Sequence, residues 1–265
     1  MYWFNSPPAA IIFTLGPINF YWYGLIMVIA MLAAYLLVWR LAQKNNWHSN
    51  DLLDLIFNII VAGLIGARFY HVLIHWSDYS NQLLDILKVW QGGLAIHGGL
   101  LGGLLALWLS CRHRHWPFWQ LTAWLTPGVA LGQAIGRWGN FFNQELFGPA
   151  STLPWAIPID IWHRPINALA TSHFQPLFFY ESMACLALAI LLYYLNKSSV
   201  VPTKIVCVYL IGYGIIRLTM EFFRQDPTLY LLGWRWPQWL SLILILFGLS
   251  LIILYQQPAA KFAKK

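Results

Sequence analysis

The feature that most limits the fold of this chain is a series of long apolar stretches separated by short polar ones. Each stretch is long enough for a helix that crosses the hydrocarbon core of a bilayer, which takes about 20 residues. The strict alternation typical of a membrane β-barrel is not evident. Seven stretches are expected to span the membrane, with boundaries accurate to several residues: Ile18–Trp39, Leu52–Trp76, Leu94–Cys111, Trp119–Phe142, Leu177–Leu195, Ile205–Phe223 and Trp239–Tyr255.

The composition supports a membrane protein. Only 9% of the 265 residues are charged, whereas a soluble domain carries about 25% charged residues. The sequence therefore predicts an all-α, polytopic helical bundle that forms a single integral-membrane domain over residues 1–265. The three cysteines, at positions 111, 185 and 207, lack CxxC spacing, which favours buried structural thiols over disulfides or a metal site.

Lysine and arginine gather on one side of the predicted bundle. Of the sixteen, nine follow odd-numbered spans, four follow even-numbered spans and three lie inside spans. The nine are Arg40, Lys44, Arg112, Arg114, Lys197, Lys204, Lys261, Lys264 and Lys265. Because loops rich in these residues stay in the cytoplasm, we expect the N-terminus outside and the C-terminus in the cytoplasm. The net charge of +7 is then a topological signal, and nucleic acid is not an expected partner.

The longest segment between predicted spans, residues 143–176, follows the fourth span. It contains five prolines, at positions 149, 154, 158, 165 and 176, which argue against a long helix. With the orientation above, this segment lies outside the membrane. We therefore expect a small extracytoplasmic cap between the fourth and fifth spans.

Polar residues fall at one depth in six of the seven predicted spans. They lie toward the outer ends, whereas the inner halves are nearly all apolar apart from Asp54. Because ionisable residues inside a membrane are costly and usually mark function, we expect a site in the outer leaflet. The residues at this depth are Tyr23, Arg68, His97, Arg137 to Glu145, Tyr180, Glu181, Tyr213, Arg217 and Glu221.

Arg217 and Glu221 are four residues apart, on one helical face with Tyr213 and Arg224. The pattern fits an ion pair that only joins helices. It also fits an arginine that Glu221 orients toward a phosphate, and this second interpretation is favoured because of the depth of the pair in the membrane.

Arg137 lies between Gly136 and Gly139, which permit close approach of a backbone or a ligand. The simpler interpretation is a basic side chain that extends to the membrane surface. Arg137 and Arg217 at the same depth would bind a phosphodiester bidentately, with Asn140 and Asn143 placed to orient ester or glycerol oxygens.

His97 lies between two pairs of glycines. Gly93 and Gly92 precede it by four and five residues, and Gly98 and Gly99 follow it directly. A single histidine in an apolar stretch is commonly a packing residue. The glycines would instead leave room around an imidazole that acts as a base near neutral pH, and both interpretations remain open. His71 and His75 lack the intervening glutamate of a zinc-binding HExxH motif, so a metal site is not expected.

These segments resemble the bacterial prolipoprotein diacylglyceryl transferase family. The central match is Gly136-Arg137-Trp138-Gly139-Asn140-Phe141-Phe142-Asn143-Gln144-Glu145, continuing to Gly148. The other matches follow in family order over nearly the whole chain: Trp22 to Leu25, Gly66 to Arg68, Gly92 to Gly99, Tyr180 with Glu181, Gly212 to Gly214 with Arg217, and Glu221 to Arg224.

Two positions depart from the family pattern. Pro149 stands where the family commonly has arginine, and Gln175 precedes Pro176 where the family commonly has histidine. Both positions lie in or beside the expected cap, so they concern the cap rather than the intramembrane site.

The resemblance implies a transferase of lipoprotein biosynthesis in the bacterial cytoplasmic (inner) membrane. Its substrates would be phosphatidylglycerol and the lipobox cysteine of a preprolipoprotein, and it would release glycerol phosphate without a metal or an organic cofactor. The site would face the extracytoplasmic leaflet. Membrane lipids would surround the chain.

The resemblance also implies residue roles. His97 would be the base, and Arg137 and Arg217 would stabilise the departing phosphate. Glu145 and Glu221 would orient those arginines or bind the glycerol headgroup. The substrate-binding set would comprise Tyr23, Arg68, Asn140, Asn143, Glu145, Gly148, Tyr180, Glu181, Tyr213 and Glu221.

Two other functions are weighed against this one. A transporter or flippase for anionic lipids would also use intramembrane arginines, but it would need polar groups along a whole path, and the inner halves of the spans lack them. A catalytically silent relative is compatible with the two departures.

Overall fold

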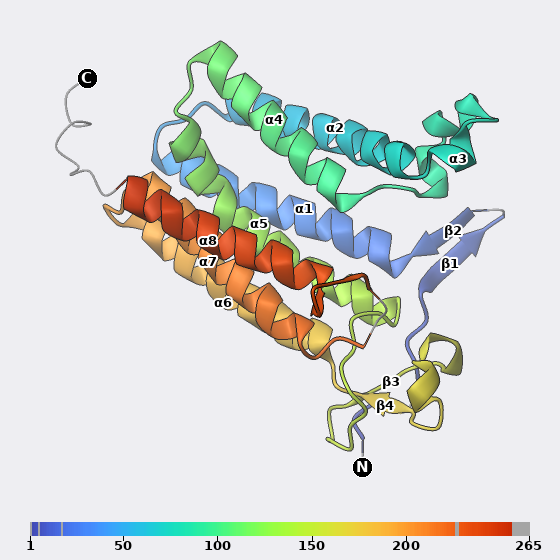
Figure 1. The fold of residues 1–265 in the computed structure, drawn as a ribbon. Coiled ribbons are helices and arrows are strands. Elements are labelled where there is room, and N and C mark those ends of the chain that lie inside the picture. Colours follow the sequence, from blue (N-terminus) through green and yellow to red (C-terminus); the bar gives the residue numbers. More distant parts are fainter. Residues whose placement is uncertain (1, 5, 17, 226–227, 256–265) are drawn as a thin grey trace. The chain divides into compact units, whose positions relative to one another are not determined.

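The computed structural model describes residues 2–4, 6–16, 18–225 and 228–255. Within these residues, seven helices of 19 to 26 residues account for most of the chain (Figure 1). Each predicted span corresponds to one of them. They are α1 (Trp22–Lys44), α2 (Ser49–Ile74), α4 (Ile96–Arg114), α5 (Phe118–Phe142), α6 (Leu177–Lys197), α7 (Pro202–Glu221) and α8 (Trp236–Leu254). Lys261, Lys264 and Lys265, which contributed to the predicted orientation, lie outside the described residues.

The start of the first predicted span is wrong. Ile18–Tyr21 forms strand β2, which pairs antiparallel with β1 (Ile11–Leu15), and α1 begins at Trp22. Gly16, with φ of 57°, provides the left-handed backbone of the turn. Because both strands are largely apolar, hydropathy alone merges β2 with the helix that follows.

Five of the long helices, α1, α2, α6, α7 and α8, are long and apolar enough to cross a membrane. The other two, α4 and α5, are not among the helices that meet this criterion; α4 is rich in glycine, and α5 contains Pro127. The chain is therefore a multi-pass helical membrane protein. That all seven helices span the membrane remains a prediction.

The chain divides into two compact units, whose boundaries fall within α1 and α5. The first unit comprises Met1–Val38 and Thr122–Lys265, and the second comprises Trp39–Leu121. The prediction of a single domain over residues 1–265 stays a prediction.

In the first unit, α5 packs closely on α1 through three glycines spaced four residues apart, Gly128, Gly132 and Gly136. A Cβ atom added to Gly128 would lie 3.0 Å from the carbonyl oxygen of Ala34, and one added to Gly136 would lie 3.5 Å from Sδ of Met27. Such small residues let helix backbones approach in a membrane, where van der Waals packing rather than hydrophobic exclusion joins helices.

The same device joins the later helices of this unit, which lie side by side (Figure 1). A Cβ atom at Gly214 of α7 would lie 3.0 Å from the carbonyl oxygen of Ser241 in α8, and one at Gly248 of α8 would lie 3.3 Å from that of Cys207 in α7. The pairing of α7 with α8 brings the end of α7 next to the start of α8.

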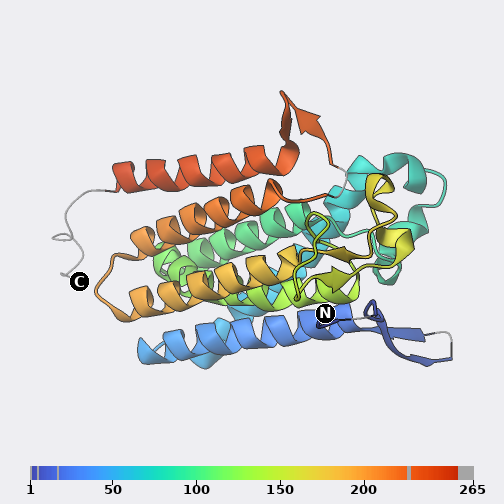
Figure 2. The same cartoon turned by 90° about the horizontal axis from the view of Figure 1, so that it is seen from below.

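Residues 143–176 contain no long helix, as their prolines predict. They form the two-stranded sheet β3 (Ile157–Pro158) and β4 (His173–Phe174) and the short 3-10 turns η3 (Ile161–His163) and η4 (Ile166–Ala168). We call this segment the cap. It lies at the end of the first unit opposite the turn between α6 and α7 (Figures 1 and 2). Its apolar residues Leu146, Ile157, Ile159 and Phe174 form one cluster with Phe178 of α6.

The second unit is built on the pair α2 and α4. Gly66 of α2 faces Gly98 and Gly102 of α4, so the two backbones touch without intervening side chains. Between these helices the chain forms the short helix α3 (Trp76–Tyr79) and two 3-10 turns, η1 (Leu83–Leu87) and η2 (Val89–Gln91).

Candidate functional site

Arg137 and Arg217 meet at one carboxylate. Nη2 of Arg137 donates to Oε1 of Glu181 at 2.6 Å, and Nη1 of Arg217 donates to both oxygens of Glu181 at 3.1 Å. Arg137 lies near the end of α5, Glu181 near the start of α6 and Arg217 in the last part of α7. These three residues from separate helices therefore come together, and their common depth in the membrane stays a prediction.

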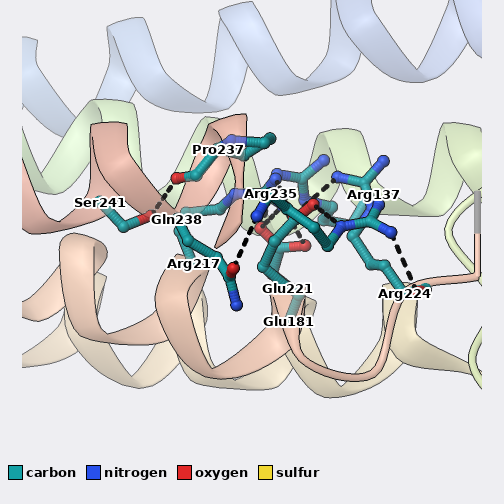
Figure 3. A network of polar contacts seen from close by, with 9 residues as sticks. All are labelled: Arg137, Glu181, Arg217, Glu221, Arg224, Arg235, Pro237, Gln238 and Ser241. Atoms are coloured by element: carbon teal, nitrogen blue, oxygen red, sulfur yellow. Dashed lines mark hydrogen bonds and ion pairs between the residues drawn. The ribbon is translucent and has the colours of Figure 1, made fainter. Parts of the chain in front are cut away.

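Glu221 is a second, almost fully buried acceptor. It lies 3.2 Å from Nη2 of Arg217, 3.4 Å from Nη1 of Arg224 and 2.8 Å from Nε of Arg235. The pairing with Arg217, expected from the four-residue spacing, is confirmed. We call Arg137, Glu181, Arg217, Glu221, Arg224 and Arg235 the arginine network (Figure 3).

The two carboxylates of the arginine network are shared among several guanidinium groups. Glu181 pairs with Arg137 and Arg217, and Glu221 pairs with Arg217, Arg224 and Arg235. In addition, Nε of Arg137 is buried and has no hydrogen-bond partner among the described residues. Because buried donors are normally satisfied, this arrangement is suited to an anionic ligand with several acceptor oxygens, such as a phosphate.

Arg235 is a member of the network that the sequence did not predict. The sequence places it among the loop cations, whereas it is buried just before α8. Arg235 is the last residue of the hairpin formed by β5 (Tyr230–Leu231) and β6 (Trp234–Arg235). The backbone N–H of Arg235 donates to Oε1 of Gln238 at 2.9 Å. The available signal was the Arg-Trp-Pro sequence, because proline favours the first turn of a helix.

Tyr213 lies one helical turn before Arg217. Its ring stacks on that of Tyr209 with 5.9 Å between the centroids, and the Tyr209 hydroxyl accepts a hydrogen bond of 3.1 Å from Nε2 of Gln133. Tyr213 thus lies beside the network on the helical face predicted for it.

Asn140, Asn143 and Glu145 form a separate amide–carboxylate group. The Nδ2 atoms of the two asparagines donate to the two Glu145 oxygens at 3.1 and 3.3 Å. The sequence led us to expect Glu145 either to orient the arginines or to bind the glycerol headgroup; its described contacts are with the two asparagines, and both roles stay predictions. Glu145 follows the end of α5, and from there its side chain reaches the two asparagines.

Tyr23, at the start of α1, packs on α5. A Cβ atom added to Gly139 would lie 2.6 Å from Cδ2 of the Tyr23 ring. We expected Gly139 to leave space for a backbone or a ligand beside Arg137. The Tyr23 ring fills the space at Gly139 instead. The Tyr180 hydroxyl accepts a 2.9 Å hydrogen bond from Nε1 of Trp155 in the cap.

The two departures from the family pattern lie next to each other. The backbone N–H of Gln175 donates to the carbonyl oxygen of Pro149 at 3.0 Å, and that of Gly148 donates to the carbonyl oxygen of Gln175 at 2.8 Å. Gly148 is buried against Leu177, where a Cβ atom would lie 3.0 Å from Cγ. Gly148 thereby joins the cap to the start of α6.

In the second unit, Arg68 is buried and fully occupied. A guanidinium has five N–H groups, and Arg68 makes five contacts of 2.6 to 3.5 Å with backbone carbonyls of the loop that precedes α4. The acceptors are Asp85, Ile86, Lys88, Gly92 and Gly93. These contacts favour a role in positioning the loop; the substrate-binding role stays a prediction.

His97 lies in the first turn of α4, and its exposed ring is centred 6.0 Å from that of Tyr70. The two glycines that follow it were expected to clear space around the imidazole, but they serve helix packing. Gly98 faces Gly66, and a Cβ atom on Gly99 would contact Ala67 in α2. The proposed meeting of His97 with the arginines stays a prediction.

No group of three side chains able to hold a metal ion occurs within the residues that the structure describes. His71 and His75 stack with 4.3 Å between their ring centroids. A pair of histidines without a third ligand gives no metal centre of the usual three or four protein ligands.

Known proteins similar to this chain share one description. The family model described as prolipoprotein diacylglyceryl transferase matches residues 10–254. A phosphatidylglycerol–prolipoprotein diacylglyceryl transferase of Synechococcus elongatus is 40% identical over 95% of this chain and 89% of its own length. Proteins of the same name are 38% identical in Synechocystis sp., over 93% of this chain and 89% of the relative, and 41% identical in Parasynechococcus marenigrum, over 84% and 82%. The chain therefore belongs to the prolipoprotein diacylglyceryl transferase family.

Proposed function

We propose that this chain transfers the diacylglyceryl group of phosphatidylglycerol to the lipobox cysteine of a preprolipoprotein. The cysteine thiolate attacks the glyceryl carbon that carries the phosphate. A carbon–sulfur bond forms, the carbon–oxygen bond breaks, and glycerol phosphate leaves with the bonding electrons. Family membership supports the reaction, and the convergence of Arg137 and Arg217 supports its chemistry.

The observation that carries this proposal is the convergence of Arg137 and Arg217 on Glu181. Glu181 holds the two guanidinium groups close together against their repulsion. Because they share one carboxylate, Arg137 and Arg217 can also donate to the negative charge that develops on the departing phosphate. This form of stabilisation contributes most in many enzymes. Arg224 and Arg235 hold Glu221, and Glu221 in turn orients Arg217.

His97 is proposed as the base that takes the thiol proton. A cysteine thiol is only partly ionised at neutral pH, so a base increases the fraction of attacking thiolate. The family resemblance around Gly92–Gly99 supports this role, and Arg68 would act through the loop before His97. Tyr23, Tyr180, Tyr213, Gly148 and the amide–carboxylate group are proposed to position the lipid or the cap.

The membrane topology is part of the proposal. All seven long helices would span the bacterial inner membrane, with the N-terminus and the cap outside and the C-terminus in the cytoplasm. The uneven distribution of lysine and arginine supports this orientation. It puts the arginine network in the leaflet that faces the cap.

The test is a transfer assay on the purified full-length chain in vesicles with radiolabelled phosphatidylglycerol and a lipobox peptide. Label that stays on the peptide through a thioether supports the transferase. Movement of the lipid between leaflets without peptide labelling would favour a flippase. A chain that binds the peptide but does neither would be a catalytically silent relative.

Arg137→Ala is expected to lower transfer by about 100-fold or more, because one donor to the developing charge is lost. Insertion into the membrane and the elution profile in detergent should match those of the native chain. Near-normal transfer by this variant would contradict the role of Arg137.

His97→Gln is expected to lower transfer by about 100-fold or more, because general-base catalysis contributes about 10²–10⁴-fold. The loss should become smaller at alkaline pH, where the thiol of the substrate ionises without a base. A variant that keeps the native rate at neutral pH would assign the proton to another acceptor.

A further inference from the structure

A cavity of about 790 Å³ lies between the cap and the loop that follows α7. Its walls come from three separated segments of the first unit, residues 144–147, 163–166 and 224–225. The wall residues that bear on binding are Gln144, Glu145, Arg164, Ile166, Arg224 and Gln225. All three segments lie beyond the ends of the seven long helices.

The cavity touches both polar groups of the first unit. Arg224, in its wall, donates to Glu221, and Glu221 holds Arg217. Glu145, also in its wall, is the acceptor for Asn140 and Asn143. A molecule bound in the cavity therefore extends directly to the arginine network.

The chemistry of the walls argues against a lipid tail as the occupant. An acyl chain packs along apolar helix faces within the hydrocarbon region, whereas these walls present two guanidinium groups, two side-chain amides and a carboxylate. The same walls also contain apolar surface from Phe147 and Ile166. Walls that combine polar groups with apolar surface are typical of sites that bind an extended peptide, through its backbone and alternate side chains.

We propose that this cavity binds the segment of the protein substrate that immediately follows the acceptor cysteine. This inference rests on the proposed function, in which that cysteine reacts at the arginine network. The signal stretch before the cysteine is apolar and remains in the hydrocarbon region. The segment after the cysteine continues out of the membrane, and the polar cavity beyond the helix ends receives it.

The experiment compares two peptides with the same lipobox. One ends directly after the cysteine, and the other continues for about eight residues, roughly 27 Å when extended. The variant Ile166→Arg changes the cavity wall, and Trp162→Arg is the matched control on the same cap outside the wall. Both side chains are highly exposed, at 92% and 90%, so neither variant should impair folding.

Ile166→Arg should raise the KM for the long peptide about tenfold, corresponding to about 1.4 kcal/mol, and leave the KM for the short peptide unchanged. Trp162→Arg should change neither value. A photoreactive benzoylphenylalanine at position 166 should cross-link the long peptide, and the same group at position 162 should not.

Equal KM values of the two peptides on the native chain would overturn the inference, as would equal effects of the two variants. A change in the KM for phosphatidylglycerol in Ile166→Arg would assign the cavity to the lipid headgroup instead. If the native chain modifies neither peptide, the proposed function fails; modification of both without dependence on length refutes only the peptide cavity.

Discussion

Glu181→Gln is the substitution that most directly tests how the arginine network is held together. The Glu181 side chain is 3% exposed, and it accepts from Arg137 at 2.6 Å and from Arg217 at 3.1 Å. Glutamine preserves the shape and one acceptor oxygen but removes the negative charge. Arg137 and Arg217 then lose the carboxylate that they share.

The size of the effect follows from these contacts. Removing one partner of a buried ion pair costs about 3–5 kcal/mol. Because the glutamine oxygen still accepts one hydrogen bond, we expect a loss near the lower limit, about 3 kcal/mol. For a chain of this size, the unfolding midpoint falls by about 2–4 °C for each kcal/mol of unfolding free energy that is lost. The expected loss should therefore lower the midpoint by roughly 6–12 °C.

The assay is thermal unfolding of the purified chain in detergent, with and without added phosphatidylglycerol. The anionic phosphate of the lipid can replace the lost carboxylate as a counter-charge. Added lipid should therefore reduce the difference between the unfolding midpoints of the native chain and the variant. Glu145→Gln is the control, because Glu145 is exposed and, among the described residues, accepts from two neutral amides. Equal midpoints for the two variants would show that the Glu181 carboxylate does not hold the arginine network together.

Two further predictions concern packing around the site. Arg68→Lys keeps the charge but loses the planar set of five donors. We therefore expect faster hydrogen exchange in the loop before His97 and a lower kcat, with the KM for phosphatidylglycerol unchanged. A rise mainly in that KM would support substrate binding by Arg68. Gly139→Ala should cost about 1–3 kcal/mol of stability, because its Cβ atom would lie 2.6 Å from the Tyr23 ring. Gly136→Ala should be tolerated, because the nearest neighbour of its Cβ atom would lie 3.5 Å away. Similar thermal midpoints for both variants would contradict this packing.

Much of the fold could be predicted from the sequence, because the number and approximate limits of the long helices depend on hydropathy along the chain. The prolines of residues 143–176 likewise predicted the absence of a long helix there. The β1–β2 hairpin was missed because β2 and the start of α1 are both apolar. Strand pairing depends on a turn at Gly16 rather than on composition.

The candidate site was predictable only where its contacts are local. Arg217 and Glu221 lie four residues apart on one helix, so their pairing follows from helical geometry. Glu145 was expected beside arginines, but it pairs with Asn140 and Asn143. The carbonyl acceptors of Arg68 carry no signal in the sequence, because every residue has the same backbone carbonyl.

The sequence by itself determined that this chain is a helical membrane protein of a lipid-transferring family, with two arginines at one depth. Only the tertiary structure decided which carboxylates those arginines contact. Glu181 is 44 residues from Arg137 and 36 from Arg217, and a hairpin brings Arg235 to Glu221. The physical reason is that hydropathy acts along the chain and fixes the helices. The partners of a buried charge instead depend on how closely the helices pack, and in this protein glycines at the helix contacts set that distance.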